Sequence, residues 1–272
     1  ARAALVAERG VTGRRIVLTG ASGGVGAALA RRLAAPGVAM LLTGRDEARL
    51  DAAAGAARAG GAAVETARLD VTDREALAAA LIAFDAAAPV DLLIANAGVS
   101  AGLGPGRAPE RPDAARRVWA VNYGGVVNTV EPLLPAFLAR GRGSLALMSS
   151  MAARRPLPDM PSYSASKAAV RAYGESLRGW LGPRGIAVTV LCPGFVTSPM
   201  SARHRGFKPF EIDADRAADI MARGIARRAA FVTFPWPLAL LCWLDRRLPP
   251  KLADRLAGGF AAEITPDGET GG

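Results

Sequence analysis

Short apolar segments alternate with longer, Ala-rich segments through the first 230 residues, and this alternation allows few folds. Strands that are apolar throughout and separated by helices form a parallel sheet covered on both faces. The sequence therefore predicts an α/β fold with a doubly wound parallel sheet of seven strands. We expect strands at 15–19, 38–42, 64–69, 90–95, 144–148, 186–191 and 231–234. We expect helices at 27–35, 46–59, 73–87, 112–129, 162–181 and 213–228.

This pattern predicts one domain at 14–230, which includes a substrate loop at about 198–212. We expect 1–13 to be an N-terminal extension and 265–272 a tail. The extension has no uninterrupted apolar stretch, so we expect no secretory signal in it and a cytoplasmic location. The apolar segment 231–264 is expected to pack on the domain, on a partner subunit or on a membrane surface.

A glycine-rich loop at 19–26 follows the first strand and opens the first helix. Glycines allow a tight turn and let backbone N–H groups approach a pyrophosphate at a helix N-terminus. Its position between a strand and a helix favours a Rossmann-type dinucleotide site over a plain turn. The candidate cofactor-binding residues are Gly20, Ser22, Gly23, Gly24, Val25 and Gly26.

The end of the second strand indicates which nicotinamide cofactor would bind. An acidic residue there would bind a ribose 2′-hydroxyl, whereas an arginine would accommodate a 2′-phosphate. Arg45 occupies this position, so NADP(H) is favoured and NAD(H) stays an alternative. Asp46 is expected to cap the next helix. The competing interpretation of Arg45 is an ordinary surface arginine.

Tyr163 and Lys167 are four residues apart and share one face of a predicted helix. An ammonium beside a phenol lowers the pKa of the phenol from about 10, which makes it a usable acid or base. The chain has three tyrosines and three lysines, so a chance pair at this spacing is improbable. The alternative is an exposed pair with no chemical role.

Together the glycine loop and this pair resemble the short-chain dehydrogenase/reductase family, in its single-domain branch of about 250 residues. Further matches extend the resemblance over 14 to about 200. They are the adenine-contacting pair Asp70 and Val71, the motif Asn96, Ala97 and Gly98, the helix residue Asn122, the serine Ser150 (with Ser149 as its neighbouring candidate), and the nicotinamide-contacting segment Pro193, Gly194, Val196 and Thr197. Two departures are Gly23, where members that prefer the phosphorylated cofactor often have Lys or Arg, and Ala95, often an asparagine.

The resemblance implies an NAD(P)-dependent oxidoreductase that moves hydride between the nicotinamide and a carbonyl or alcohol carbon. Tyr163 would be the general acid and base, and Ser150 would position the substrate oxygen. Lys167 would lower the tyrosine pKa and hold the nicotinamide ribose, while Asn122 would support a water that relays protons to it. The alternatives are a non-catalytic NADP-binding, redox-responsive module and an epimerase or dehydratase on the same scaffold.

The segments 151–161 and 199–210 are expected to wall the substrate pocket. Their apolar residues favour an apolar carbonyl compound: Met151, Leu157, Met160, Met200, Phe207 and Phe210. Their arginines leave an anionic substrate such as an acyl thioester open: Arg154, Arg155, Arg203 and Arg205. The resemblance also implies a homodimer or homotetramer, formed through 112–129 and the helix of Tyr163.

The net charge of +10 is spread over scattered arginines with few aromatics, which argues against a nucleic-acid partner. Tryptophans, leucines and basic residues in 234–251 fit a peripheral membrane contact, although packing on the pocket or on a subunit is the favoured interpretation. The single histidine, His204, argues against a zinc site. Cys192 and Cys242 lack metal-ligand spacing and are expected to be buried thiols.

Overall fold

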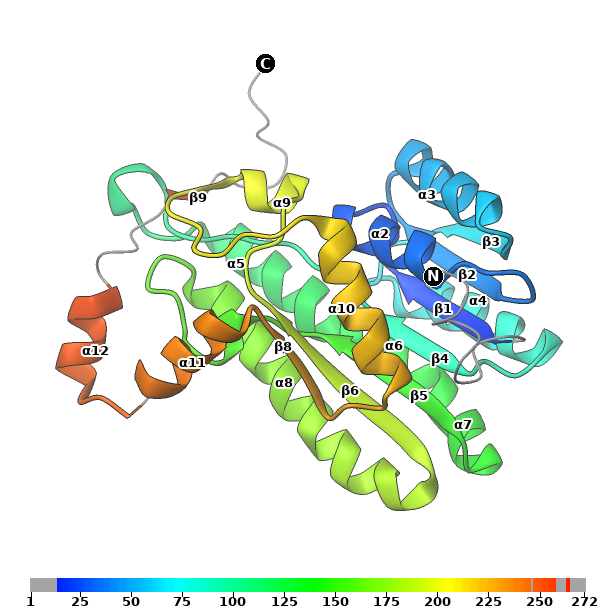
Figure 1. Ribbon diagram of the computed structural model, residues 1–272. Helices are drawn as coiled ribbons and strands as arrows, with labels where there is room; N and C mark the ends of the chain where they lie inside the picture. The colour runs from blue at the N-terminus through cyan, green and yellow to red at the C-terminus, as the bar shows by residue number, and fades with distance from the viewer. Residues whose placement is uncertain (1–13, 246, 258–262, 265–272) are drawn as a thin grey trace.

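Seven parallel strands form the central sheet of the computed structural model, in the order β3-β2-β1-β4-β5-β6-β8 (Figure 1). The structure describes residues 14–245, 247–257 and 263–264, so the predictions for 1–13 and 265–272 lie outside the described residues. The strand order reverses between β1 and β4, which is where doubly wound sheets bind ligands. The strands are β1 Arg15–Thr19, β2 Ala39–Gly44, β3 Ala63–Arg68, β4 Leu92–Ala95, β5 Gly143–Met148, β6 Ile186–Pro193 and β8 Phe231–Phe234.

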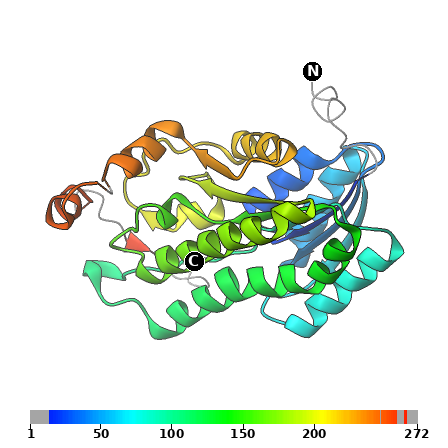
Figure 2. The ribbon, with the colours of Figure 1, turned by 90° about the horizontal axis from the view of Figure 1, so that it is seen from below.

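Helices cover both faces of this sheet, which confirms the predicted doubly wound fold. Ile16 and Leu18 of β1 pack towards α2 and α10, whereas Val17 packs towards α4 and α8, because successive strand residues point to opposite faces. Figure 2 shows α8 and α10 on opposite sides of the sheet. The helices are α2 Gly24–Leu33, α3 Glu47–Ala59, α4 Arg74–Ala87, α5 Pro112–Trp119, α6 Gly125–Val130, α7 Leu134–Arg140, α8 Pro161–Leu181, α9 Pro199–Ala202, α10 Ala214–Ala226, α11 Trp236–Asp245 and α12 Pro250–Ala257.

The helix expected at 112–129 is interrupted. A π-helical turn, Ala120–Gly124, separates α5 from α6 and contains Asn122. Such turns occur as single wide turns within helices, often at functional sites. The backbone of Gly125 lies close to the loop that follows β3, because a Cβ on Gly125 would be 2.5 Å from Cγ2 of Val71.

The C-terminal segment forms two helices, α11 and α12, that the sequence pattern did not predict. Pro237 and Pro250 lie in their first turns, where a missing N–H removes no helical hydrogen bond. Further along, β9 Glu263–Ile264 pairs antiparallel with β7 His204–Arg205 (Figure 1). This pairing brings Ile264 against Met160 and Tyr163. None of the helices among the described residues is long and apolar enough to cross a membrane.

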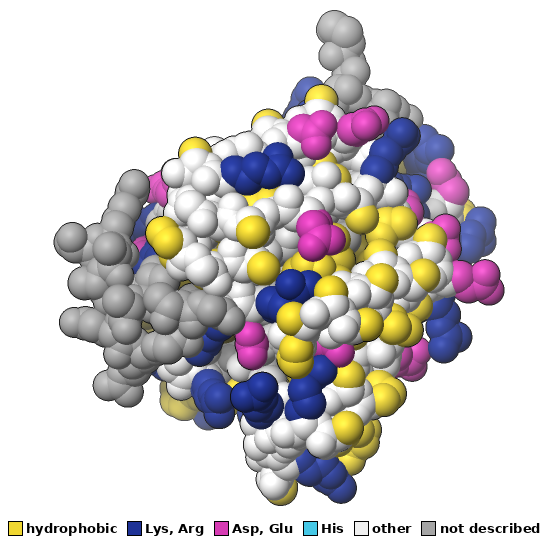
Figure 3. Space-filling view, turned by 90° about the vertical axis from the view of Figure 1, so that its right-hand side faces the viewer, with side chains coloured by type: hydrophobic (Ala, Val, Ile, Leu, Met, Phe, Trp, Pro, Cys, Tyr) yellow, Lys and Arg dark blue, Asp and Glu magenta, His cyan; other side chains and the backbone are white. Residues whose placement is uncertain are grey.

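The face at the β3 edge carries charges of both signs. Figure 3 shows Lys and Arg side chains interspersed with Asp and Glu side chains there. Ion pairs account for part of this mixture, including Arg49 with Asp46 at 3.2 Å and Arg68 with Glu47 at 3.9 Å. Positive charge on this face is therefore balanced locally and forms no continuous stripe.

Candidate active site

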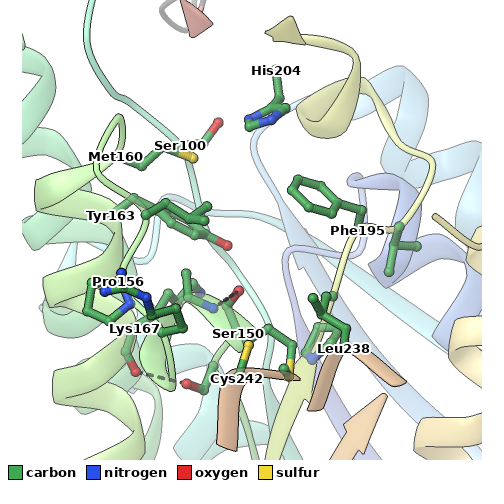
Figure 4. A pocket seen from close by; sticks show the side chains of 18 of the residues that line it. Ser100, Ser150, Pro156, Met160, Tyr163, Lys167, Phe195, His204, Leu238 and Cys242 are labelled. Carbon is green, nitrogen blue, oxygen red and sulfur yellow. Dashed lines mark hydrogen bonds between the residues drawn. The ribbon is translucent and has the colours of Figure 1, made fainter. Parts of the chain in front are cut away.

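A cavity of about 550 Å³ opens at the carboxyl ends of the strands. Helix α8 contributes Tyr163 and Lys167 to one wall, and Phe195 and Leu238 stand across from them (Figure 4). Because α8 begins at Pro161, both functional side chains lie in its first two turns. The cavity thus lies where a parallel sheet is expected to hold a ligand.

Ser150 and Tyr163 meet in this cavity, where the Ser150 hydroxyl acts on the phenol so as to lower its pKa. Ser150 follows the end of β5, and its Oγ accepts a hydrogen bond from the backbone N of Ala152 at 3.1 Å. The neighbouring candidate, Ser149, instead donates to the backbone O of Lys167 at 2.8 Å and is buried. Ser150 is therefore the serine hydroxyl that faces the phenol.

Lys167 is buried, with 3% of its surface exposed, and its Nζ donates to the backbone O of Met148 at 2.9 Å. Desolvation lowers the pKa of Lys167 to about 8, an effect that the Cys192 thiolate would oppose. The Nζ lies 5.8 Å from the centroid of the Tyr163 ring. Both members of the predicted pair are thus brought together at one site.

The expected lowering of the tyrosine pKa is absent from this arrangement. Burial raises the pKa of Tyr163, and the hydrogen bond with Ser150 partly opposes that rise. The physical reason is that the Lys167 ammonium is directed at the Met148 carbonyl and not at the phenol oxygen. The phenol is therefore protonated at neutral pH.

Asn122 is fully buried in the π-helical turn and holds the loop after β4. Its Oδ1 accepts from the backbone N of Val99 at 2.8 Å, and its Nδ2 donates to the Val99 O at 3.0 Å. Nδ2 also donates to Oγ of Ser166 on α8 at 3.1 Å. Gly98 lies between Asn122 and Lys167. A Cβ on Gly98 would be 3.3 Å from Asn122 Oδ1 and 3.3 Å from Lys167 Nζ.

The glycine loop has a geometry that fits a dinucleotide pyrophosphate. Gly20 has a φ of +69°, and a Cβ on Gly26 would lie 2.2 Å from the Gly20 carbonyl oxygen. Asn96 fixes the loop to β4, since its Nδ2 donates to the backbone O of Thr19 at 3.0 Å and of Gly20 at 3.1 Å. The N-cap Gly23 supplies no side-chain cap. The first N–H groups of α2 are therefore open to an anion.

Arg45 lies at the carboxyl end of β2 beside this loop. Its side chain is half-exposed, and its Nη1 is 3.7 Å from Oδ2 of Asp70. Ser22 packs against the neighbouring Gly44, whose Cβ would lie 2.6 Å from Ser22 Oγ. Asp46 caps α3 by accepting from the backbone N of Arg49 at 3.0 Å, which confirms the expected cap. Asp46 is thereby occupied at the helix terminus.

The remaining predicted cofactor residues lie partly in the cavity wall and partly outside it. Pro193, Gly194 and Val196 line the cavity, as do Asn96 and Gly98. Thr197 is exposed and its N donates to the Ile212 O at 2.9 Å. Val71 is buried against α4 and α6. Ala97 lies under the turn at Gly20, because a Cβ on Gly20 would be 2.6 Å from the Cα of Ala97.

The cavity wall contains Ser100 and Phe195, which the sequence interpretation did not name. His204 also lines the cavity, within the segment 199–210 expected there. Leu238, Leu241 and Cys242 line it from the segment 234–251, for which packing on the pocket or on a subunit was the favoured interpretation. His204 is buried with its ring centroid 5.0 Å from that of Phe195, and burial lowers its pKa. The expected Met151, Leu157, Met160, Met200 and Phe207 line the cavity, whereas Phe210 does not.

The arginines expected at this wall have other partners. Arg155 lines the cavity, but its Nε is 2.5 Å from Oδ2 of Asp245 and its Nη2 is 3.5 Å from Oδ1 of Asp254. Arg154 lines a different cavity. Both predicted thiols, Cys192 and Cys242, are free and buried, as expected.

Comparison with known proteins agrees with this site. Residues 14–208 match the sequence profile of the short chain dehydrogenase family. The chain is 38% identical over 245 residues to an uncharacterized oxidoreductase from Myxococcus xanthus, covering 90% of this chain and 96% of the relative. It is 36% identical over 264 residues to one from Mycobacterium tuberculosis, covering 91% and 99%.

Solved structures show the same fold. A short-chain dehydrogenase from Burkholderia phymatum in complex with NAD gives a TM-score of 0.77 at 26% identity, covering 87% of this chain and 94% of that one. One from Sphingobium yanoikuyae in complex with NADPH gives 0.73 at 27% identity, covering 87% and 97%. The chain therefore belongs to the short-chain dehydrogenase family, and the predicted class of NAD(P)-dependent oxidoreductase is confirmed at that level.

Proposed function

We propose that this protein is an NADP(H)-dependent oxidoreductase that interconverts a carbonyl and an alcohol group on an apolar substrate. The observation that carries the proposal is the meeting of Tyr163, Ser150 and Lys167 in one cavity beside the glycine loop. The nicotinamide, when bound, supplies or accepts the hydride. The glycine loop and the open N-terminus of α2 would hold the pyrophosphate.

Tyr163 is the general acid in the reductive direction and the base in the oxidative direction. A carbonyl oxygen that gains charge needs a proton donor and a second hydrogen-bond donor. The Tyr163 hydroxyl provides the proton, and Ser150 Oγ orients the same oxygen. Lys167, whose Nζ lies 5.8 Å from the centroid of the Tyr163 ring, would hold the nicotinamide ribose beside the phenol.

The preference for NADP(H) is supported by Arg45. A guanidinium at the end of β2 suits a 2′-phosphate, and Ser22 adds a hydroxyl beside it. Asp70 competes for the same guanidinium at 3.7 Å, but an exposed pair at that separation is weak. NAD(H) stays the alternative, because solved relatives bind NADPH in one case and NAD in another.

An apolar substrate is supported by the residues around the phenol. Phe195 and Leu238 face Tyr163 across the cavity, and Met160 lies beside Tyr163, so all three contribute hydrocarbon to the cavity wall (Figure 4). Arg155, the arginine at this wall that an acyl thioester would use, is paired with two carboxylates. The oxidoreductase relatives do not favour a non-catalytic NADP-binding module or an epimerase or dehydratase.

The test is turnover of a panel of ketones, aldehydes and the matching alcohols, assayed separately with NADPH and NADH. We expect oxidation of NADPH with long-chain or cyclic apolar ketones and lower rates with short, charged carbonyl compounds. Binding of NADPH without turnover of any carbonyl or alcohol would contradict the proposal and would favour the non-catalytic module.

We further propose a homodimer or homotetramer formed through α5 and α8. Trp119 and Trp180 are exposed at 43% and 45% on these helices. Tyr123 and Tyr173 meet edge to face between them, with ring centroids 6.1 Å apart. Light scattering after gel filtration tests this assignment: Trp119→Arg and Trp180→Arg should shift the mass towards the monomer, and an unchanged mass would contradict it.

Helix α11 supports both interpretations of the segment 234–251. Its inner side lines the cavity through Leu238 and Leu241. Its outer side exposes Trp236 at 74% and Leu240 at 47%, and neither of these residues lines the cavity. We propose that the outer side contacts an anionic membrane surface peripherally, in a cytoplasmic protein. Flotation with anionic liposomes at low salt tests this contact, and failure to co-migrate would contradict it.

A further inference from the structure

A second cavity, of about 380 Å³, lies between α8, the turn after β5 and α11. It shares Cys242 with the substrate cavity and otherwise has its own wall. Its five lining residues include three arginines and no acidic residue. They are Arg154, Arg171, Cys242, Trp243 and Arg247.

Aromatic rings hold these arginines in place. The guanidinium carbons of Arg154 and Arg171 lie 5.3 and 5.7 Å from the centroid of the Phe231 ring on β8. Arg247 lies 3.3 Å from the Trp243 ring centroid and donates to the Trp243 carbonyl at 2.8 Å. Cation–π contacts fix a guanidinium without neutralising its charge or using all of its N–H donors.

Two of the guanidinium groups at this place have no carboxylate partner among the described residues. A fourth guanidinium, Arg178, stacks on the same Phe231 ring at 5.0 Å. Of the four arginines, Arg171 is paired through its Nε with Glu175 at 2.7 Å, while Arg178 and Arg247 have no ion pair with any residue in the described part of the chain. Like charges this close repel one another unless an anion lies between them.

Two buried polar atoms beside the cluster also lack partners. Arg178 Nη1 and Thr233 Oγ1 form no hydrogen bond within the described ranges. Thr233 is two residues beyond Phe231 on β8, so both side chains point to the face of the sheet that α8 covers. Buried donors normally have a hydrogen-bond partner, so this region is incompletely satisfied by the protein itself.

We propose that this cavity is a second ligand site, which binds a phosphate group through Arg154, Arg171 and Arg247. Planar guanidinium groups can each offer two N–H donors to one phosphate, and this geometry makes arginine the usual partner of such anions. The site does not depend on the oxidoreductase chemistry, because none of these arginines lines the substrate cavity. A free phosphate compound and the headgroup of a phospholipid both carry the phosphate group that this site would bind.

Calorimetric titration of the full chain with inorganic phosphate, at constant ionic strength in a chloride buffer, tests the site. We expect phosphate to bind and Arg247→Gln to weaken binding about tenfold, the change that follows from losing one charge-assisted hydrogen bond. The matched control is Arg142→Gln, which removes the same charge from an exposed residue at the start of β5 and should leave the affinity unchanged. Equal weakening by both variants would overturn the proposal, because it would indicate general charge attraction.

Thermal unfolding separates a ligand site from a merely structural cluster. In chloride alone, Arg247→Gln loses the contacts with Trp243 but relieves repulsion among like charges, so the unfolding temperature should change little. Phosphate should raise the unfolding temperature of the wild type and not of the variant. A variant that is less stable in both buffers by the same amount would contradict a ligand role for Arg247.

Vesicles distinguish the two sources of the phosphate group. Binding of inorganic phosphate supports a free ligand, whereas binding only to phosphatidylcholine vesicles that contain phosphatidic acid, lost in Arg247→Gln, supports a headgroup. If Arg247→Gln binds inorganic phosphate and the vesicles as well as the wild type does, the proposed site is overturned. Carbonyl turnover in phosphate-free buffer is measured alongside, so that failure of the proposed oxidoreductase activity and failure of this site are recognised separately.

Discussion

Lys167 Nζ lies 5.8 Å from the centroid of the Tyr163 ring, yet it donates its hydrogen bond to the Met148 carbonyl. The ammonium therefore makes no direct hydrogen bond to the phenol, and it does not shift the pKa of Tyr163. Burial raises that pKa, and the Ser150 hydroxyl partly opposes the rise. Burial and the serine, not the lysine, therefore set the acidity of the phenol in this arrangement.

Replacing Tyr163 by Phe should remove turnover while leaving the fold and cofactor binding unchanged. The substitution deletes the proton donor but keeps the ring that packs against Met160 and Ile264. General acid catalysis typically contributes about 10²–10⁴-fold, so we expect kcat to fall by at least that factor. Steady-state kinetics and NADPH fluorescence titration check the two parts, and retained turnover would exclude Tyr163 as the acid.

The buried Lys167 predicts a pH dependence of stability. Its folded-state pKa of about 8 lies below the unfolded value, so between pH 8 and about 10.5 the unfolded chain binds more protons. The free energy of unfolding of the ligand-free wild type should therefore rise with pH through this window. From this one group, the free energy of unfolding should rise by up to roughly 1.4 kcal/mol per pH unit.

Lys167→Met removes this titration and serves as the comparison. Urea unfolding at pH 7, 8, 9 and 10 should show Lys167→Met to be more stable than the wild type at pH 7, by an amount that shrinks above pH 8. A constant difference across the four pH values would show that Lys167 has an ordinary pKa in the folded protein.

Much of the fold could be predicted because apolar strands and Ala-rich helices alternate without ambiguity. The candidate positions were also predictable where a motif follows a strand, as at Gly20 after β1 and Ser150 after β5, and the structure brings Ser150 together with Tyr163 of α8 in one cavity. The hydrogen-bond partner of Lys167, by contrast, could not be predicted, because it depends on which groups lie next to its side chain in the folded protein. The Lys167 contact with Met148 depends on β5 and α8 packing together, which no spacing in the sequence reveals.

The C-terminal part of the site was less predictable for a different reason. Ile264 packs against Met160 and Tyr163 of the cavity wall through a two-residue pairing with β7, and such short strands carry no periodicity. Helix α11 is apolar on most of its surface, so its sequence does not show which side lines the cavity. Prolines near its start also resemble chain breaks, although the first helical turn accepts them.

Asn122 should prove important for stability as well as for the site. Asn122→Ala would leave the buried N–H and C=O of Val99 without partners, at about 1–3 kcal/mol for each unsatisfied group. Asn128→Ala is the matched control, since Asn128 is half-buried and makes one hydrogen bond, to the Val71 carbonyl at 2.9 Å. Urea denaturation should show the larger loss for Asn122→Ala, and equal losses would contradict the structure.

Gly26 and Gly55 should respond in opposite ways to replacement by alanine. A Cβ on Gly26 would lie 2.2 Å from the Gly20 carbonyl oxygen, so the loop must shift, at a typical cost of about 1–3 kcal/mol. Gly55 lies within α3 with nothing inside 4 Å of its Cβ position, so alanine there should stabilise the fold by about 0.5–1 kcal/mol. Thermal unfolding measures both, and a neutral Gly26→Ala would show that the loop is less tightly packed.

Arg45 should determine the choice between the two nicotinamide cofactors. Arg45→Asp removes the partner of a 2′-phosphate and introduces a carboxylate, which suits a ribose 2′-hydroxyl and repels a phosphate. We expect kcat/KM with NADPH to fall by about tenfold or more, the effect of losing one charge-assisted hydrogen bond, while that with NADH rises. Arg68→Asp is the matched control, because Arg68 is an exposed arginine at the same edge whose Nε donates to the Arg45 carbonyl at 3.3 Å. If both variants change the ratio of NADPH to NADH activity equally, general electrostatics and not Arg45 sets the preference.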